Sequence, residues 1–168
     1  IVNQVASSTV ALSSDQDVPS FYVLNVILRH MNFDVENVRM ISELVKNKIL
    51  FVLSFNKLEM TGVFENEWLS SGWKKSGTYC IKLKGLSISE AWNHILFYLS
   101  GYNEASGLDF YQVQGIQMRI KRIDYEISLK RKEMGALVQP NQAVAIFEEI
   151  KRLENESAVL NKSLENRG

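Results

Sequence analysis

The chain has 168 residues, of which 46% are hydrophobic, and its formal net charge is zero. The apolar content supports a packed core and argues against wholesale disorder. The 19 basic and 19 acidic residues balance, which argues against a dedicated polyanion binder, since such proteins are usually clearly basic. A local basic patch remains compatible with this balance.

The cysteine content points to a reducing compartment. Cys80 is the single cysteine, so an internal disulfide and a cysteine-based metal cluster are excluded. Cys80 lies in an apolar run, where we expect it to be a small buried hydrophobe. No apolar run reaches the roughly 18 residues of a membrane span, and no signal peptide is visible. We expect a cytoplasmic protein without a cofactor, and a natural start that precedes Ile1.

The first half of the chain shows strand and helix patterns in turn. Residues 1–14 alternate weakly, which predicts an edge strand, and residues 21–28 predict a second strand. Asp34 is a good N-cap for a helix over residues 35–47. The expected buried face of this helix consists of Val38, Ile41, Leu44 and Val45.

Three further segments are predicted to complete a sheet. Residues 49–55 are almost continuously apolar, which indicates a central strand covered on both faces. Residues 58–64 are predicted to return beside it, and residues 70–77 to form a loop holding Trp73. Residues 78–84 alternate apolar and polar side chains as a half-buried strand does.

A short helix is predicted after this sheet. Ser87 and Glu90 form a capping box, with serine at the N-cap and glutamate three residues later. Gly101 is well placed to end the helix. The expected buried side consists of Ile88, Trp92, Ile95, Leu96 and Leu99.

The last third of the chain has apolar residues spaced alternately by three and four. Such a stripe is typical of a helix buried against another helix. It predicts two antiparallel helices, at about 109–134 and 140–165, which form a coiled-coil-like hairpin with a break from Gly135 to Pro140. The predicted helix seam consists of Ile116, Ile120, Ile123, Ile127, Ile150, Leu153, Leu160 and Leu164, with Met134, Leu137 and Ile146 continuing the pattern.

These patterns together predict an α+β fold. We expect a small mixed or antiparallel sheet with two helices over residues 1–101, a linker over 102–108 and the helical hairpin over 109–168. Each arm of the hairpin would be about 40 Å long, because an α-helix rises 1.5 Å per residue. A hairpin of this kind provides contact surface rather than chemistry.

The first arm of the hairpin is rich in basic residues, and two interpretations follow. Phosphate contact with nucleic acid is one. The other is pairing with the acidic second arm, since complementary charges commonly flank an apolar seam. We favour pairing and keep nucleic-acid contact as the alternative. The basic residues concerned are Arg119, Lys121, Arg122, Lys130, Arg131 and Lys132.

Acidic residues near the sheet raise the question of a metal-dependent nuclease. Such enzymes hold a divalent ion with carboxylates beside a lysine, usually with an acid and the lysine two residues apart on one strand. Lys82 and Lys84 have no acid at that offset, and charges that protect an edge strand explain the residues better. The residues are Glu59, Glu65 and Glu67, with Lys82 and Lys84 on a later segment.

The remaining candidates favour structure over catalysis. His30 and His94 show neither metal-ligand spacing nor a nucleophile–base pattern. No glycine-rich phosphate loop is visible. The aromatic residues could stack bases, but we expect them to belong to the core or to cover an end of the sheet. They are Phe64, Trp68, Trp73 and Trp92.

The order of several short motifs resembles an uncharacterised bacterial family, domain-of-unknown-function family 4391, over residues 17–165. The resemblance implies no reaction and no catalytic residues. Members are often encoded beside helicases and DNA methyltransferases of restriction-type defence loci, so it implies an accessory role in such a system. The motifs are Phe21–Leu24, Ile49–Leu53, Val63–Trp68, Leu83–Ser87 and Glu90–Trp92, followed by the charged helical tail.

The sequence therefore predicts a non-enzymatic, cytoplasmic bacterial interaction protein. Its hairpin would mediate self-association or dock to a larger DNA-processing partner. A nucleic-acid-binding accessory that uses the basic residues of the first arm is the alternative. A metal-dependent, nuclease-like enzyme is the weaker one.

Overall fold

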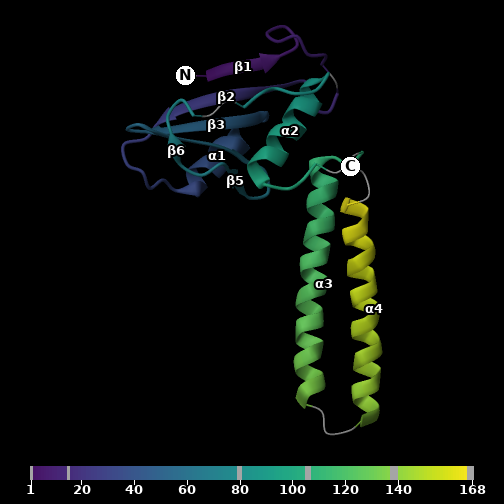
Figure 1. Ribbon diagram of the computed structural model, residues 1–168. Helices are drawn as coiled ribbons and strands as arrows, with labels where there is room; N and C mark the ends of the chain where they lie inside the picture. The colour runs from purple at the N-terminus through teal and green to yellow at the C-terminus, as the bar shows by residue number, and fades with distance from the viewer. Residues whose placement is uncertain (1, 15, 79–80, 105–106, 137–139, 166–168) are drawn as a thin grey trace. The chain divides into compact units, whose positions relative to one another are not determined.

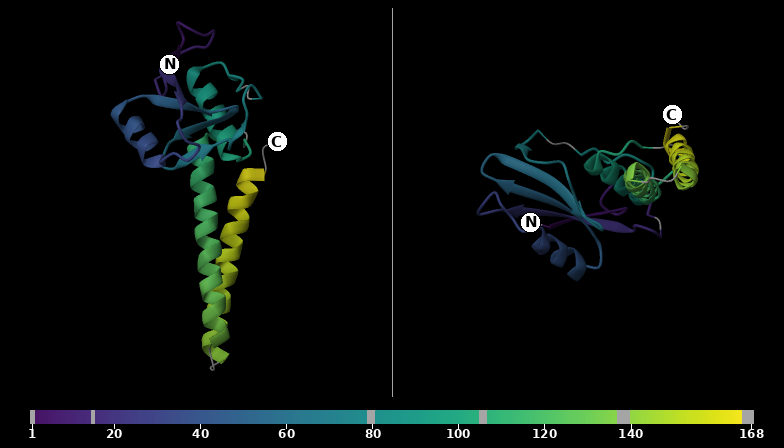
Figure 2. Two further views of the ribbon diagram at one scale, coloured as in Figure 1. Left: turned by 90° about the vertical axis from the view of Figure 1, so that its left-hand side faces the viewer. Right: turned by 90° about the horizontal axis from the view of Figure 1, so that it is seen from below.

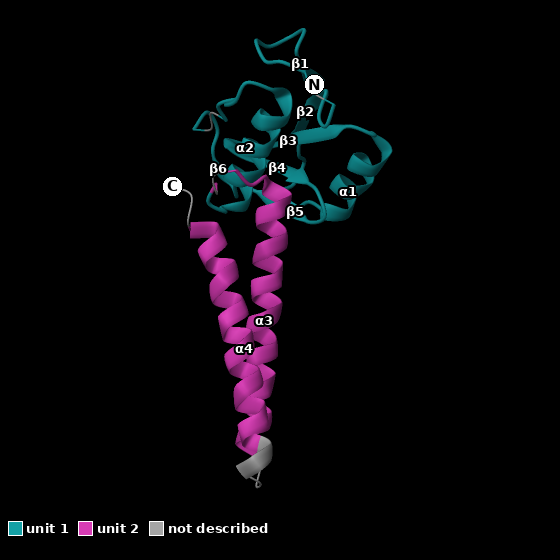
Figure 3. Cartoon of the chain, turned by 90° about the vertical axis from the view of Figure 1, so that its right-hand side faces the viewer, with its two compact units in different colours: residues 1–103 teal, residues 104–168 magenta. Residues whose placement is uncertain are grey.

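The computed structural model describes residues 2–14, 16–78, 81–104, 107–136 and 140–165. The chain divides into two compact units, Ile1–Asn103 and Glu104–Gly168 (Figure 3). The first unit contains a sheet and two helices, and the second contains a pair of long helices. The predicted α+β fold is confirmed. Cys80 and Leu137 lie outside the described residues.

The first unit is built on a six-stranded mixed sheet in the order β1-β2-β3-β4-β5, with β6 also paired to β4 (Figure 1). β2 and β3 pair in parallel, which requires a crossover, and helix α1 supplies it. β1–β2, β3–β4, β4–β5 and β4–β6 pair antiparallel. The strands are β1 Val2–Ala6, β2 Ser20–Ile27, β3 Lys48–Phe55, β4 Leu58–Phe64, β5 Trp68–Ser70 and β6 Lys74–Lys75.

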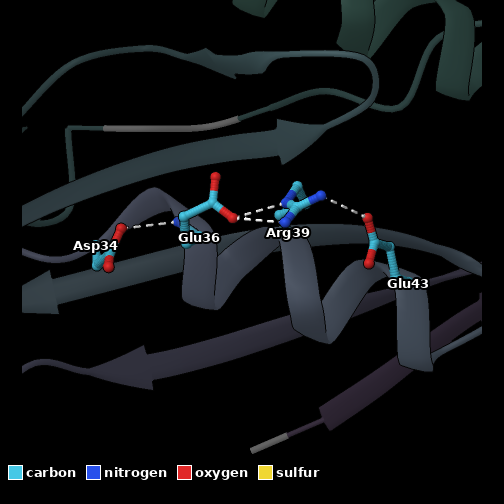
Figure 4. A network of polar contacts seen from close by, with 4 residues as sticks. All are labelled: Asp34, Glu36, Arg39 and Glu43. Atoms are coloured by element: carbon cyan, nitrogen blue, oxygen red, sulfur yellow. Dashed lines mark hydrogen bonds and ion pairs between the residues drawn. The ribbon is translucent and has the colours of Figure 1, made fainter.

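Helix α1, Val35–Leu44, covers one face of this sheet. Asp34 caps it as predicted, because its side chain accepts a hydrogen bond from the backbone N–H of Glu36 at 2.9 Å. Arg39 links Glu36 and Glu43 along the exposed side at 2.7 and 3.3 Å (Figure 4). The buried side packs on the central strands through the cluster Val38, Ile49, Phe51, Leu53 and Met60.

The prediction that Leu44 is buried was wrong. Val38 is buried, and Ile41 and Val45 are half-buried, but Leu44 is 78% exposed. The helix ends at Leu44, with Val45 as its C-cap, rather than at residue 47. Leu44 also lies about 120° around the helix from Val38, because each residue turns the helix by about 100°.

Helix α2, Ile88–Ser100, covers the opposite face of the sheet (Figure 2). The Ser87 hydroxyl accepts a hydrogen bond from the Glu90 backbone N–H at 3.2 Å, and Gly101 ends the helix with a left-handed φ of 72°. The Glu90 carboxylate accepts from the N–H of Leu86, one residue before the N-cap, at 2.6 Å. The ring of Trp92 packs on Phe21 of β2, with centroids 5.0 Å apart. All five residues predicted to be buried on this helix are buried.

Two predictions about residues 70–84 were wrong. Residues 74–75 form β6, where a loop was expected. The described residues of the expected strand, Thr78 and 81–84, lie outside any strand. β3 pairs with one side of β4, and β5 and β6 pair with the other, so β4 has no free side for a further strand.

The second unit is the predicted hairpin. Its helices are α3, Phe110–Ala136, and α4, Pro140–Glu165. They run antiparallel, since Arg119 in the first half of α3 pairs with Glu156, whereas Lys130 near its end pairs with the earlier Glu149. Gly135 is helical, so the predicted break begins later than expected. Within the described residues, no helix is both long enough and apolar enough to cross a membrane.

Candidate interaction surface

The predicted seam is closed inside the hairpin. Ile123 and Ile127 of α3 form one buried cluster with Ile150 and Leu153 of α4, and Met134, Ile146 and Leu160 pack against it. Ile120 is also buried, and Ile116 and Leu164 are half-buried. None of the eight predicted seam residues is exposed, so they leave no contact patch of their own.

Ion pairs between the two arms flank this seam. Arg119 pairs with Glu156 at 2.7 Å, Lys130 with Glu149 at 2.6 Å, and Arg131 with Glu154 at 2.6 Å. The hydrogen bond that Lys130 donates to Glu149 raises the pKa of the ammonium group and lowers the pKa of the carboxyl group. Three of the six basic residues considered for nucleic-acid contact, Arg119, Lys130 and Arg131, are therefore engaged with α4.

One seam position is polar and was not among the predicted residues. Ser157 follows Leu153 by four residues and precedes Leu160 by three, and only 8% of it is exposed. Its hydroxyl donates to the carboxylate of Asp124 on α3 at 3.5 Å, and Asn161 donates to its backbone oxygen at 3.0 Å. A polar group at such a position favours one register of two helices over others. The regular three–four spacing was the signal that could have found it.

A second set of apolar residues on α3 points away from the seam. Met118, Tyr125 and Leu129 are 62%, 65% and 47% exposed. Their spacing of seven and four residues places them on one face of the helix. At about 100° per residue, this face lies roughly opposite Ile123 and Ile127. We call these three residues the outer row.

Basic residues outnumber acidic ones around the outer row. Lys121, Arg122 and Lys132 lie on the same side of α3 by helical position, are exposed, and form no ion pair within the described part of the chain. Glu126 and Glu133 also border the row, three residues before and four residues after Leu129, whereas Asp124 lies further round the helix. The row and the three basic residues are called the outer face.

Two of the acidic residues considered for a metal site in the first unit are engaged in local contacts. Glu59 accepts from the Ser76 hydroxyl at 2.7 Å and from the Gly77 N–H at 3.2 Å, and Glu65 pairs with Lys48 at 2.9 Å. Glu59 does not protect an edge, because β4 is paired on both sides. Glu67, Lys82, Lys84 and His30 are exposed, and His94 is half-buried. Across the described ranges, no three His, Cys, Asp or Glu side chains gather as a metal site would require.

The aromatic residues proposed for base stacking belong to the core. Phe64, Trp68 and Trp73 pack against the cluster beneath α1, and Trp92 is buried against Phe21. The ring of Trp68 contacts those of Phe33 and Phe51 edge-on, at 5.8 and 6.1 Å. The structural interpretation of these residues is confirmed.

The first unit also has a polar cavity of about 410 Å³ beside the starts of β2 and β3. Its lining includes Ser20, Ser42 and Lys46, and the Lys48–Glu65 ion pair forms one wall. Because these two charges neutralise each other, the wall of the cavity has less net charge than the outer face of α3, and the cavity is the weaker candidate for a charged ligand.

Comparison with known proteins adds no further signal. No family model matches the chain, and searches of the curated proteins and of the solved structures return no match. The function of the chain is therefore inferred from the residues and contacts described above.

Proposed function

We propose that this chain is a non-enzymatic interaction protein whose hairpin contacts another protein through the outer face of α3. The observation that carries this proposal is the exposure of Met118, Tyr125 and Leu129, which is 47–65%. Large apolar side chains gathered on one exposed face commonly mark protein contacts. The fold of the hairpin has its own apolar seam and does not need them.

Among the described side chains of the second arm there is no equivalent row. The exposed large apolar residues there are Val144 and Phe147 near the start of α4 and Val159 near its end. Glu148, Arg152 and Asn155 lie between these positions, so the outer side of α4 is mostly polar and of mixed charge. α3 is therefore the better candidate for the contact.

The resemblance to domain-of-unknown-function family 4391 supports a setting for this contact. The proposal places the chain in a bacterial cytoplasm, as an accessory to a DNA-processing or defence system. The order of the short motifs, rather than any side-chain contact, supports this part. The first unit would then serve as a scaffold.

Solution mass and retention of partner proteins test the proposal. The row variant, Met118→Ser with Tyr125→Ser and Leu129→Ser, is compared with the wild-type chain and with the control Val159→Ser, which removes an exposed apolar residue from α4. Light scattering over a concentration series reports self-association, and retention from a bacterial extract reports other partners. The row variant should lose association that the control keeps. Equal association by all three proteins would contradict the proposal.

A nucleic-acid-binding accessory is the second candidate. Arg122 and Lys132 favour it, because they form no ion pair within the described residues, and Arg122 lies one helical turn from Tyr125, which is 65% exposed. Phosphate contacts predict an affinity for DNA that falls steeply with salt and is lost on Arg122→Glu with Lys132→Glu. Absence of DNA binding at low salt would remove this candidate.

A further inference from the structure

We infer that the outer face of α3 binds an amphipathic helix of a different protein, whose apolar stripe is flanked by Asp and Glu residues. This inference rests on the proposed function and adds the chemistry of the partner. Three features of the outer face carry it: the length of the apolar row, the sign of the charge around it, and the lack of ion pairs that engage this charge within the described residues.

The geometry of the row suits a helix. Met118 and Leu129 are eleven residues apart, which corresponds to about 16 Å along the axis of α3. Residues at positions i, i+7 and i+11 form a straight ridge, and a partner helix meets such a ridge with its own apolar stripe. A contact of three turns buries a small area, so the complex should be weak and reversible.

The charge on the outer face determines which charged residues a partner helix should carry beside its apolar stripe. Lys121, Arg122 and Lys132 outnumber Glu126 and Glu133, the two acidic residues that border the row, so the outer face has a net positive charge. The other basic residues, Arg119, Lys130 and Arg131, are already paired with α4. An acidic partner would therefore gain attraction at the rim of the contact, and a basic one would be repelled.

Two other occupants fit less well. A second copy pairing through the same face would place three basic residues and only two acidic ones from each copy at the interface, and the excess of like charge is unfavourable. Nucleic acid would be held by phosphate contacts and by stacking on aromatic rings. Met118 and Leu129 provide neither, although they make up most of the row.

The test uses the full chain and a designed probe. The probe is a helical peptide of about three heptads with Leu at the a and d positions and Glu beside them. A matched peptide carries Lys in place of Glu. Titrations follow the methyl signals of Met118 and Leu129 by NMR, which locates the binding. The Glu peptide should shift both signals, and its affinity should fall as salt is raised.

Variants separate the apolar part of the contact from the charged part. The row variant should bind the Glu peptide about tenfold more weakly or worse, since loss of one buried anchor commonly costs that factor. The double variant Arg122→Glu with Lys132→Glu should bind the Glu peptide more weakly and the Lys peptide more tightly. Val159→Ser and Lys162→Glu on α4 are the matched controls and should change neither affinity.

The outcomes distinguish this inference from the proposed function. Unchanged Met118 and Leu129 signals with the Glu peptide, or equal binding of the two peptides, would overturn the inference. If association still depends on the outer row in the light-scattering or retention experiment, the proposed function survives that result. Row-dependent growth of the mass of the chain alone would overturn the inference by assigning the face to a second copy. Binding of duplex DNA that displaces the Glu peptide would overturn it by assigning the face to nucleic acid.

Discussion

The two units of this chain bury their apolar side chains in different ways. The sheet of the first unit is covered by α1 on one face and by α2 on the other, so its core is enclosed. Among the described residues of this unit, the most exposed apolar ones, Ile27, Leu86 and Leu44, lie at the ends of elements or beside them. The hairpin has a single seam and two outer sides that face away from it.

This difference shows where an exposed apolar residue is informative. At the end of a strand or helix, such a residue is exposed because few neighbouring side chains are available to pack against it. In the middle of α3, Met118, Tyr125 and Leu129 repeat at helical spacing on the side that folding leaves unused. The same helix therefore carries one apolar set that holds the hairpin together and a second set that the hairpin does not require.

The largest expected effect comes from a charge placed in the seam. Ile123 is fully buried between the arms, so Ile123→Asp should cost about 3–5 kcal/mol through the lost packing and the buried charge. Hydrogen exchange should show loss of protection in α3 and α4 while the strands of the first unit keep theirs. Tyr125→Asp, on the outer row of the same helix, is the matched control and should change stability by no more than about 0.5 kcal/mol.

Substitution of a glycine in the sheet, Gly62→Ala, should give the next largest loss of stability, and this loss should be confined to the first unit. A Cβ added at Gly62 would lie 2.4 Å from the ring of Trp68 and 2.8 Å from the backbone oxygen of Leu69. Gly62→Ala should therefore lower the free energy of unfolding by about 1–3 kcal/mol through overpacking, which chemical denaturation measures. Unchanged stability of Gly62→Ala would contradict the close packing of Trp68 on β4.

Gly115 of α3 is the matched control for this substitution. Within the described residues, an added Cβ at Gly115 would meet no neighbouring atom within 4 Å. Gly115→Ala should stabilise the hairpin by up to about 1 kcal/mol, since alanine is the better helix former. Replacement of glycine by alanine should therefore destabilise the first unit at Gly62 and stabilise the hairpin at Gly115.

Loss of a helix cap should have a smaller effect on the first unit. Ser87→Ala removes the acceptor for the Glu90 N–H and should lower the free energy of unfolding by about 1 kcal/mol. Chemical denaturation of both proteins measures the difference. Ser87→Asp keeps an acceptor at the N-cap and should restore most of the loss. Equal stability of wild type and Ser87→Ala would show that the cap contributes nothing.

The smallest expected effect is a pH dependence of the hairpin. The pKa of Glu149 lies below its ordinary value of 4.5, so the stability from this group is present above that value and is lost as pH falls through the lowered pKa. The pKa of Lys130 lies above 10.5, so its contribution is present below that value and is lost as pH rises through the raised pKa. Thermal unfolding of wild type and Glu149→Gln should differ near pH 7 and converge in strong acid. A difference that persists in acid would show that the charge of Glu149 is not its cause.

Local patterns predicted much of the fold. The Asp34 and Ser87 caps, the end of α2 at Gly101 and the three–four repeat of the hairpin depend on neighbours in sequence, and all are present. The failures concern long-range choices. Whether residues 78–84 pair with another strand depends on the arrangement of the whole sheet, and the alternation of the segment itself carries no information about that arrangement.

The candidate site was predicted less completely than the fold. The basic residues of α3 were recognised as one group, but a helix turns about 100° per residue and divides them between two sides. Arg119, Lys130 and Arg131 reach α4, whereas Lys121, Arg122 and Lys132 do not. The outer row was overlooked because the apolar seam dominates the pattern, although the spacing of Met118, Tyr125 and Leu129 is present in the sequence.

The most direct test of the central claim is hydrogen exchange of α3 in the wild-type chain and in the row variant with serine at positions 118, 125 and 129. We predict nearly equal protection of the α3 amides in the two proteins, because the seam and not the outer row holds the hairpin. Loss of protection in the row variant would contradict the claim, since it would show that the outer row is needed for folding and is not a free surface for a partner.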